Sequence, residues 1–232
     1  MLSSPGRDTA EQPSLIKLLH AGIAEGKPWA KERRLAYLMY AYRLEPEMSG
    51  VLLLAKTKPV FLDLANGFSS GKFTHKWVAL SQGTPDQDHF EVQARLSPDR
   101  VRPGAMRVDA RRGKAARTVF TLLEKFAGYT LLQCELATNR THQVQVHLRS
   151  KGLRVAGDPL YGGQPLLLSS LKRNYRLKPQ ATERPLLARA AVHAAELASV
   201  HPVTGQPLAI TAPWPKDLSV AVKYLRRYAA AG

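Results

Sequence analysis

One stretch of the chain decides the fold: Tyr42-Arg43-Leu44-Glu45-Pro46-Glu47-Met48-Ser49-Gly50-Val51-Leu52-Leu53-Leu54-Ala55-Lys56. It reads as a polar turn, marked by Pro46 and Gly50, that leads into a short apolar run over 51–55. A run of this length is typical of a buried strand and is too short to span a membrane. Charged side chains on a loop held by such a strand are a common arrangement of catalytic sites. A surface turn with a local ion pair explains the same pattern.

The composition favours a polyanionic partner. The 232 residues include 34 Lys and Arg against 18 Asp and Glu, so the formal net charge is +16 and the pI about 10.2. Such a charge suits nucleic acid or an anionic membrane surface. No apolar run approaches the roughly 20 residues that a membrane-spanning helix needs. The hydrophobic content of 44% suffices for one large domain or two small ones.

The cysteine and histidine pattern gives no metal site. Cys134 is the only cysteine, and no Cys/His cluster has metal-ligand spacing. Residues 1–12 lack the apolar core of a signal peptide. We therefore expect a cytoplasmic, monomeric protein that faces RNA or DNA and uses neither a metal nor a cofactor.

Hydrophobic periodicity and turn residues predict alternating helices and strands, preceded by a mobile tail over 1–13. Residues 30–41 fit either a second helix or an irregular approach to the first motif. The predicted helices cover 14–25, 58–68, 141–152 and 213–228, and the predicted strands cover 51–55, 73–82, 89–96, 118–124, 129–137 and 208–212.

A strongly basic loop follows the strand at 89–96. Charge runs are usually solvated surface, but this one has only Asp99 and Asp109 in compensation, so we interpret it as a phosphate-contacting loop. Residues 164–183 are a less patterned basic insertion that is a candidate second phosphate contact. The eight basic residues of the loop are Arg95, Arg100, Arg102, Arg107, Arg111, Arg112, Lys114 and Arg117.

The opening stretch resembles the signature of the RluA-type pseudouridine synthases, H-R-L-D-x-x-T-S-G followed by an apolar strand and A-K. Arg43, Leu44, Ser49 and Gly50 match it. The family's catalytic Asp is replaced by Glu45, its His by Tyr42 and its Thr by Met48.

Four further motifs resemble the same family in the same order. In the K-x-Y-x-A strand, Trp77 stands at the Tyr position and His75 at the Lys position. In L-x-T-G-R-T-H-Q-[IL]-R-V-H, the second Arg is Gln145 and the Gly is Asn139, a residue that tolerates left-handed backbone angles. Gly157-Asp158-Pro159-Leu160-Tyr161-Gly162 matches G-D-x-x-Y-G, and 192–207 resembles the L-H-A…H-P-x-T-G-x-P segment.

The resemblance implies an α/β (α+β) pseudouridine synthase fold: a long, mixed, mostly antiparallel sheet flanked by helices and loops, with RNA in a basic cleft. We expect a single such domain over 36–232 and a shortened N-terminal tail and helix over 1–35, without room for an S4-type domain. The family isomerises uridine in RNA without a cofactor. The resemblance therefore implies structured RNA, rRNA or tRNA, as the partner.

The same resemblance assigns the site residues. The catalytic positions are Glu45 (family Asp), Trp77 (family Tyr) and Gln145 (family Arg), with Arg43 as an alternative partner for Glu45. RNA contacts are predicted at Arg107, Arg111, Arg112, Lys114, Arg140, Thr141, His142 and Gln143.

Three hypotheses follow from the substitutions. In the first, the chain binds RNA but its isomerase activity is impaired or lost, because the reactive positions have changed while the surrounding motifs remain. In the second, it is an active enzyme that uses Glu45 as the carboxylate. In the third, it is a non-catalytic basic interaction module, since fold alone does not fix function.

Overall fold

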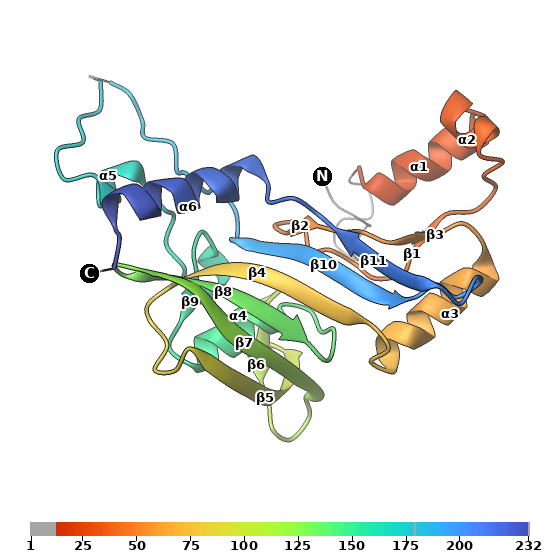
Figure 1. Cartoon of the computed structure of the whole chain (residues 1–232), viewed down its shortest axis with the longest axis horizontal. Coiled ribbons are helices and arrows are strands. Elements are labelled where there is room, and N and C mark those ends of the chain that lie inside the picture. The colour runs from red at the N-terminus through yellow and green to blue at the C-terminus, as the bar shows by residue number, and fades with distance from the viewer. Residues whose placement is uncertain (1–12, 179, 232) are drawn as a thin grey trace.

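The computed structural model describes residues 13–178 and 180–231 and is built around a nine-stranded sheet (Figure 1). The strand order is β11-β10-β4-β8-β7-β5-β6, with β2 paired to β10 and β9 paired to β4. All pairings in this sheet are antiparallel except β2 with β10. The mixed, mostly antiparallel sheet is therefore confirmed. The strands are β2 (Ser49–Gly50), β4 (Thr74–Gln82), β5 (His89–Pro98), β6 (Met106–Val108), β7 (Lys114–Phe126), β8 (Tyr129–Leu136), β9 (Arg154–Val155), β10 (Val192–Val200) and β11 (Pro207–Thr211).

Helices flank this sheet, and a two-stranded sheet lies beside it (Figure 1). In α6, Leu218, Val222 and Leu225 form the buried stripe that their spacing predicts. The two-stranded sheet pairs β1 (Met39–Tyr40) with β3 (Leu54–Ala55). The helices are α1 (Leu15–Ala24), α2 (Pro28–Glu32), α3 (Lys58–Ser69), α4 (Gln143–Ser150), α5 (Leu168–Leu171) and α6 (Lys216–Tyr228), and η1 (Pro159–Tyr161) is a 3₁₀ turn.

Most predicted elements are present, with Ser14 capping α1 as expected. Residues 30–41 contain the end of α2, an irregular segment and β1. The expected mobile tail at 1–12 lies outside the described residues.

The basic loop is not wholly irregular, because β6 forms within it and pairs with β5. The helix predicted over 141–152 is shorter, since α4 begins at Gln143 after a left-handed residue, His142.

The prediction of one continuous strand over 51–55 is wrong. Within it only Leu54–Ala55 form a strand, β3, in which Leu54 pairs with Tyr40 of β1; just before it, Gly50 in β2 pairs with Ala194 of β10 in the large sheet. Gly50 has a φ of 125°, and a Cβ on it would lie 2.2 Å from the Ala194 carbonyl oxygen. A glycine is therefore required where this turn meets the central sheet.

An aromatic cluster lies under the N-terminal half of β4. The rings of Phe68 and Phe73 stack with centroids 3.9 Å apart, and His75 meets both Tyr42 and Phe68 edge-on at 4.9 Å. His75 is 4% exposed, and burial lowers its pKa to about 4. This histidine is therefore a neutral part of the core.

We expect acid to destabilise the fold through His75. Between its ordinary pKa of 6.5 and its folded pKa of about 4, the unfolded chain binds a proton that the folded chain does not, so the free energy of unfolding falls as the pH drops through this window. At 1.36 kcal/mol per pH unit the loss is about 3 kcal/mol. Urea unfolding at pH 7 and pH 4.5 measures it. His75→Phe should reduce the difference, and an unchanged difference would contradict the assignment.

Candidate active site

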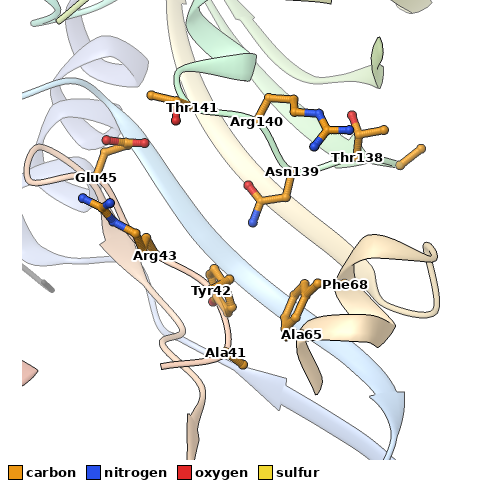
Figure 2. A pocket seen from close by; sticks show the side chains of 11 residues that line it. Ala41, Tyr42, Arg43, Glu45, Ala65, Phe68, Thr138, Asn139, Arg140 and Thr141 are labelled. Carbon is orange, nitrogen blue, oxygen red and sulfur yellow. The ribbon is translucent and has the colours of Figure 1, made fainter. Parts of the chain in front are cut away.

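The site lies where two loops meet: residues 42–49, which lead into β2, and residues 138–142, which lead into α4 (Figure 2). The first loop is fixed against the segment that opens β10. Val51 N donates to Ala194 O at 2.9 Å, the Ser49 hydroxyl lies 2.9 Å from His193 Nδ1, and an Arg189 guanidinium nitrogen donates to Glu47 O at 3.1 Å. Glu45 is thereby held on a loop with a defined course.

Gln143 fixes the second loop. Its Oε1 accepts from the Thr138 hydroxyl at 2.8 Å and from Arg140 N at 3.1 Å, and its Nε2 donates to Arg117 O and Thr118 Oγ1 at 3.0 and 2.9 Å. The side chain is 2% exposed. Its hydrogen-bonding capacity is used within the chain, so Gln143 positions the loop that carries the predicted RNA contacts Arg140 and Thr141.

His142 is the partner of Glu45. It adopts a left-handed backbone with φ 52° and ψ 28°, a conformation uncommon for a residue with a side chain and often found at functional sites. Its Nε2 lies 3.7 Å from Glu45 Oε2, and its Nδ1 lies 2.7 Å from the Tyr161 hydroxyl. The left-handed residue in this loop is therefore His142; Asn139 is not among the residues with positive φ.

Tyr161 orients the imidazole. Its hydroxyl oxygen accepts from Met106 N at 2.7 Å, so its proton is available to His142 Nδ1, and the neutral ring then presents Nε2–H to Glu45. Burial raises the pKa of Tyr161 to about 12, which keeps the phenol protonated. Asp158 caps η1 through Leu160 N and Tyr161 N, and burial raises the pKa of its carboxyl while His142 acts in the opposite direction.

We expect Tyr161→Phe to lower the free energy of unfolding by about 1–3 kcal/mol, because Met106 N loses its acceptor and His142 loses its orienting hydroxyl. Urea unfolding at pH 7.5 measures the loss. Tyr129→Phe is a matched control, since among the described residues the only hydrogen bond of the Tyr129 hydroxyl is a long one, which it accepts from Gln82 Nε2 at 3.5 Å. Equal stability of the Tyr161→Phe variant and the native chain would contradict the role.

Trp77, Gln145 and Glu45 line the same small cavity, and their catalytic roles stay a prediction. Together with Arg43 and His142 they line a small cavity of about 20 Å³, enough for about one water molecule. Trp77 and Gln145 are each 4% exposed, and in the described part of the chain neither Trp77 Nε1 nor Gln145 Oε1 has a hydrogen-bond partner. Large side chains thus occupy the space beside the carboxylate.

A much larger cavity, of about 590 Å³, also reaches Glu45 (Figure 2) and adjoins the small one, since Arg43, Glu45, Asn139 and Arg140 line both. Arg43 and Glu45 lie at one end of it, and Tyr42 and Phe68 lie at the other. Arg43 lines both cavities and is exposed, but among residues 13–178 and 180–231 no ion pair joins it to Glu45. The lining is completed by Ala41, Ala65 and residues 137–141.

The other predicted RNA contacts lie elsewhere, on the hairpin formed by β5, β6 and the start of β7 (Figure 1). Asp109 organises this hairpin: its carboxylate accepts from Arg111 N, Arg112 N and the Ser97 hydroxyl at 3.0–3.1 Å and pairs with Arg107 at 3.4 Å. Arg100, Arg111 and Arg112 surround a cavity of about 500 Å³ there. Lys114 is exposed at the start of β7. These basic residues therefore form a second surface, which joins the site loop where Arg140 Nε donates to Ala115 O at 3.1 Å.

The structure adds residues that the prediction did not assign to the site. The motif matches place Tyr161 and Asp158 only in a loop of the family, and they predict that His142 contacts RNA, not Glu45. The G-D-x-x-Y-G match was the available signal, but it did not indicate which side chain the tyrosine would contact.

The comparisons identify the family. The family described as RNA pseudouridylate synthase matches residues 24–150. The chain is 35% identical over 185 residues to ribosomal large subunit pseudouridine synthase D of Nitrosomonas europaea, covering 80% of this chain and 50% of that protein. It is 32% identical over 186 residues to an uncharacterized RNA pseudouridine synthase of Bacillus subtilis, covering 80% and 55%.

A solved structure shows the same fold. Human RNA pseudouridylate synthase domain containing 4 superposes with a TM-score of 0.67 over 93% of this chain and 84% of that chain, at 20% identity. The chain belongs to the RNA pseudouridylate synthase family. It spans about half the length of the curated relatives that it matches.

The described residues, 13–178 and 180–231, bear on two other classes of site. None of the helices there combines the length and the hydropathy that a membrane-spanning segment needs. Within the same ranges, no group of three or more His, Cys, Asp or Glu is arranged to hold a metal ion.

Proposed function

We propose that this chain binds structured RNA, rRNA or tRNA, and that its ability to isomerise uridine is lost or strongly reduced. The observation that carries the proposal is the filled space beside Glu45, where Trp77 and Gln145 leave a cavity of only about 20 Å³. A pyrimidine ring does not fit in a space that holds about one water molecule. A base that lay between Glu45, Trp77 and Gln145 would have to displace a buried side chain, whereas the open 590 Å³ cavity, which Glu45 also lines, is lined by neither Trp77 nor Gln145.

The chemistry of the three substitutions supports the same conclusion. Glu45 carries its carboxylate on one more methylene than Asp, and a displacement of about 1 Å can cost about 100-fold in rate. Gln145 is neutral and does not form the bidentate pair that an arginine forms with a carboxylate. Trp77 has no hydroxyl. The only ion-pair partner of Glu45 within the described residues is His142, at 3.7 Å.

Charge and family membership support RNA as the partner. The net charge of +16 favours a polyanion, and the basic hairpin around Asp109 presents arginines with little acidic compensation. The relative from Nitrosomonas europaea is named a ribosomal large subunit enzyme, which favours rRNA. A single domain over 36–232, a cytoplasmic location and a monomeric state are parts of the same proposal.

Binding to folded RNA and to duplex DNA tests the partner. At about 150 mM salt, we expect tRNA or an rRNA hairpin with an unpaired loop to bind at least about tenfold more tightly than duplex DNA of equal length. Filter binding with both probes measures the ratio. Equal affinity would contradict the proposal and favour a basic module without preference for RNA.

The contact between Glu45 and His142 favours a second candidate, an active synthase that uses Glu45. In this candidate the Nε2–H of His142, 3.7 Å from Glu45 Oε2, would orient the carboxylate in place of the family arginine. The discriminating variant is His142→Asn, since asparagine tolerates the left-handed backbone and removes the imidazole. Pseudouridine formation by the native chain that is lost in both His142→Asn and Glu45→Gln would establish this candidate.

A further inference from the structure

We infer that a groove between the C-terminal end of α4 and the loop after β5 binds the phosphate backbone of a duplex RNA stem. The groove has a volume of about 840 Å³ and lies between residues 101–103, the last turn of α4, β9 and η1. Among the described residues, it shares no lining side chain with the cavities that Glu45 lines or with the cavity beside Asp109. The inference rests on the proposed function, because it names a part of the RNA and the surface that would hold it.

Three arginines line the groove, and no acidic side chain of the described residues lines it. Two of them, Arg149 and Arg154, are exposed, and within 13–178 and 180–231 neither guanidinium forms a hydrogen bond or an ion pair. They belong to the run Arg149-Ser150-Lys151-Gly152-Leu153-Arg154, which has three cations and no carboxylate. A concave surface lined by one sign of charge attracts ions of the opposite sign, so the groove is suited to a polyanion.

Arg102, the third arginine, is fixed in place. Its Nε and Nη2 each lie 3.2 Å from Asp99 Oδ2, and its Nη1 donates to Leu160 O at 3.4 Å. Asp99 also accepts from Val101 N at 2.9 Å, which holds the loop that forms this wall. The ion pair compensates the charge of Arg102, so the free positive charge of the groove comes from the other two arginines.

The end of α4 accounts for only one of these two arginines. A cation in the last turn of a helix is stabilised by the carbonyl groups there, which explains Arg149. Arg154 lies instead in β9, and its Nε lies 3.8 Å from where a Cβ on Gly162 would stand. Because no group in the described part of the chain pairs with Arg154, its charge is available to a ligand.

The lining favours a sugar–phosphate backbone over a stacked base. The side chains of Leu153 and Tyr161 are each 2% exposed, so Tyr161 offers no free ring face to a base. Val101 and Gln164 are exposed and can meet the ribose and its 2′-hydroxyl. Proteins recognise double-stranded RNA mainly through such phosphate and 2′-hydroxyl contacts, which position the RNA without reading its sequence.

The groove and Glu45 would meet different parts of one RNA. His142 comes just before α4 and Arg149 lies in its last turn, so the two are about 10 Å apart along the helix axis. An unpaired nucleotide near Glu45 and a stem in the groove would therefore be successive parts of a single hairpin.

The test uses two RNA hairpins with the same loop, one with a stem of about 11 base pairs, roughly one helical turn, and one with about four. Filter binding measures affinity and its salt dependence. We expect the native chain to bind the long hairpin more tightly than the short one. Arg149→Gln/Arg154→Gln should weaken binding to the long hairpin about tenfold and reduce its slope of log K against log salt by roughly 1.8, because two phosphate contacts are lost. Binding to the short hairpin should change less than about twofold.

Two further variants separate charge at this position from charge in general. Arg149→Lys/Arg154→Lys keeps both charges and should retain most of the affinity for the long hairpin. Lys216→Gln/Lys223→Gln is the matched control: it removes two exposed charges from α6 and should affect the two hairpins equally. Circular dichroism melts confirm that each variant is folded.

The outcomes separate the groove from the proposed function. Equal losses of Arg149→Gln/Arg154→Gln on the two hairpins would overturn the groove, because a response to total charge does not depend on the length of the stem. Native affinity of this variant for the long hairpin, alongside weaker binding by Arg111→Ala/Arg112→Ala, would also overturn the groove and leave RNA binding intact. Failure of the native chain to bind either hairpin would overturn both proposals.

Discussion

Pseudouridine formation is expected to rise at least about 100-fold when Glu45→Asp, Trp77→Tyr and Gln145→Arg are combined. The aspartate withdraws the carboxylate by one methylene, and a correction of about 1 Å is worth about this factor. The tyrosine is smaller than Trp77 and opens the 20 Å³ cavity, and the arginine can pair with the carboxylate. Chemical labelling of pseudouridine in bulk RNA, after incubation with native and triple-variant protein, measures the gain.

The double variant Trp77→Tyr/Gln145→Arg is the matched control, since it opens the cavity and supplies the arginine but keeps Glu45. Its pseudouridine formation should remain well below that of the triple variant. A triple variant that is folded, binds RNA and is no more active than the native chain would contradict the account of these three positions.

The second large effect is expected on RNA affinity. Arg111→Ala/Arg112→Ala removes two exposed guanidinium groups from the hairpin while Asp109 keeps its backbone contacts. Because each phosphate contact contributes about 0.7–0.9 to the slope of log K against log salt, the slope should shrink by roughly 1.4–1.8. Filter binding to tRNA between about 50 and 200 mM salt measures it.

The matched control is Lys216→Ala/Lys223→Ala, which removes two exposed charges from α6, away from the hairpin (Figure 1). This control should change RNA affinity much less than Arg111→Ala/Arg112→Ala does. The slope of log K against log salt should stay close to that of the native chain. Equal losses from the two double variants would indicate a response to total charge, not a phosphate-binding hairpin. Arg107 is left in place because it pairs with Asp109.

The sequence pattern alone was sufficient to predict the helices and strands in which buried residues recur at a regular spacing. The stripe of Leu218, Val222 and Leu225 predicts α6, because each apolar residue lies one turn from the next. The division of residues 49–55 between two sheets was not predictable in this way. It depends on pairing with β10, which lies far along the chain and brings Ala194 against Gly50.

The site was predictable as a set of positions but not as a geometry. Glu45, Trp77 and Gln145 line one small cavity. The contact of Glu45 with His142 depends on a left-handed backbone at His142 and on the hydroxyl of Tyr161 in η1, neither of which leaves a local signal. The size of the space between Trp77 and Gln145 likewise depends on packing, which sequence pattern does not determine.

The most direct test of the central claim is to map pseudouridines in total RNA from source cells that lack this protein, after incubation with the native chain or with Glu45→Ala. We predict no new pseudouridine with either protein, together with retention of RNA by both. A pseudouridine that appears with the native chain and is absent with Glu45→Ala would contradict the claim and establish an enzyme that uses a glutamate as its catalytic carboxylate.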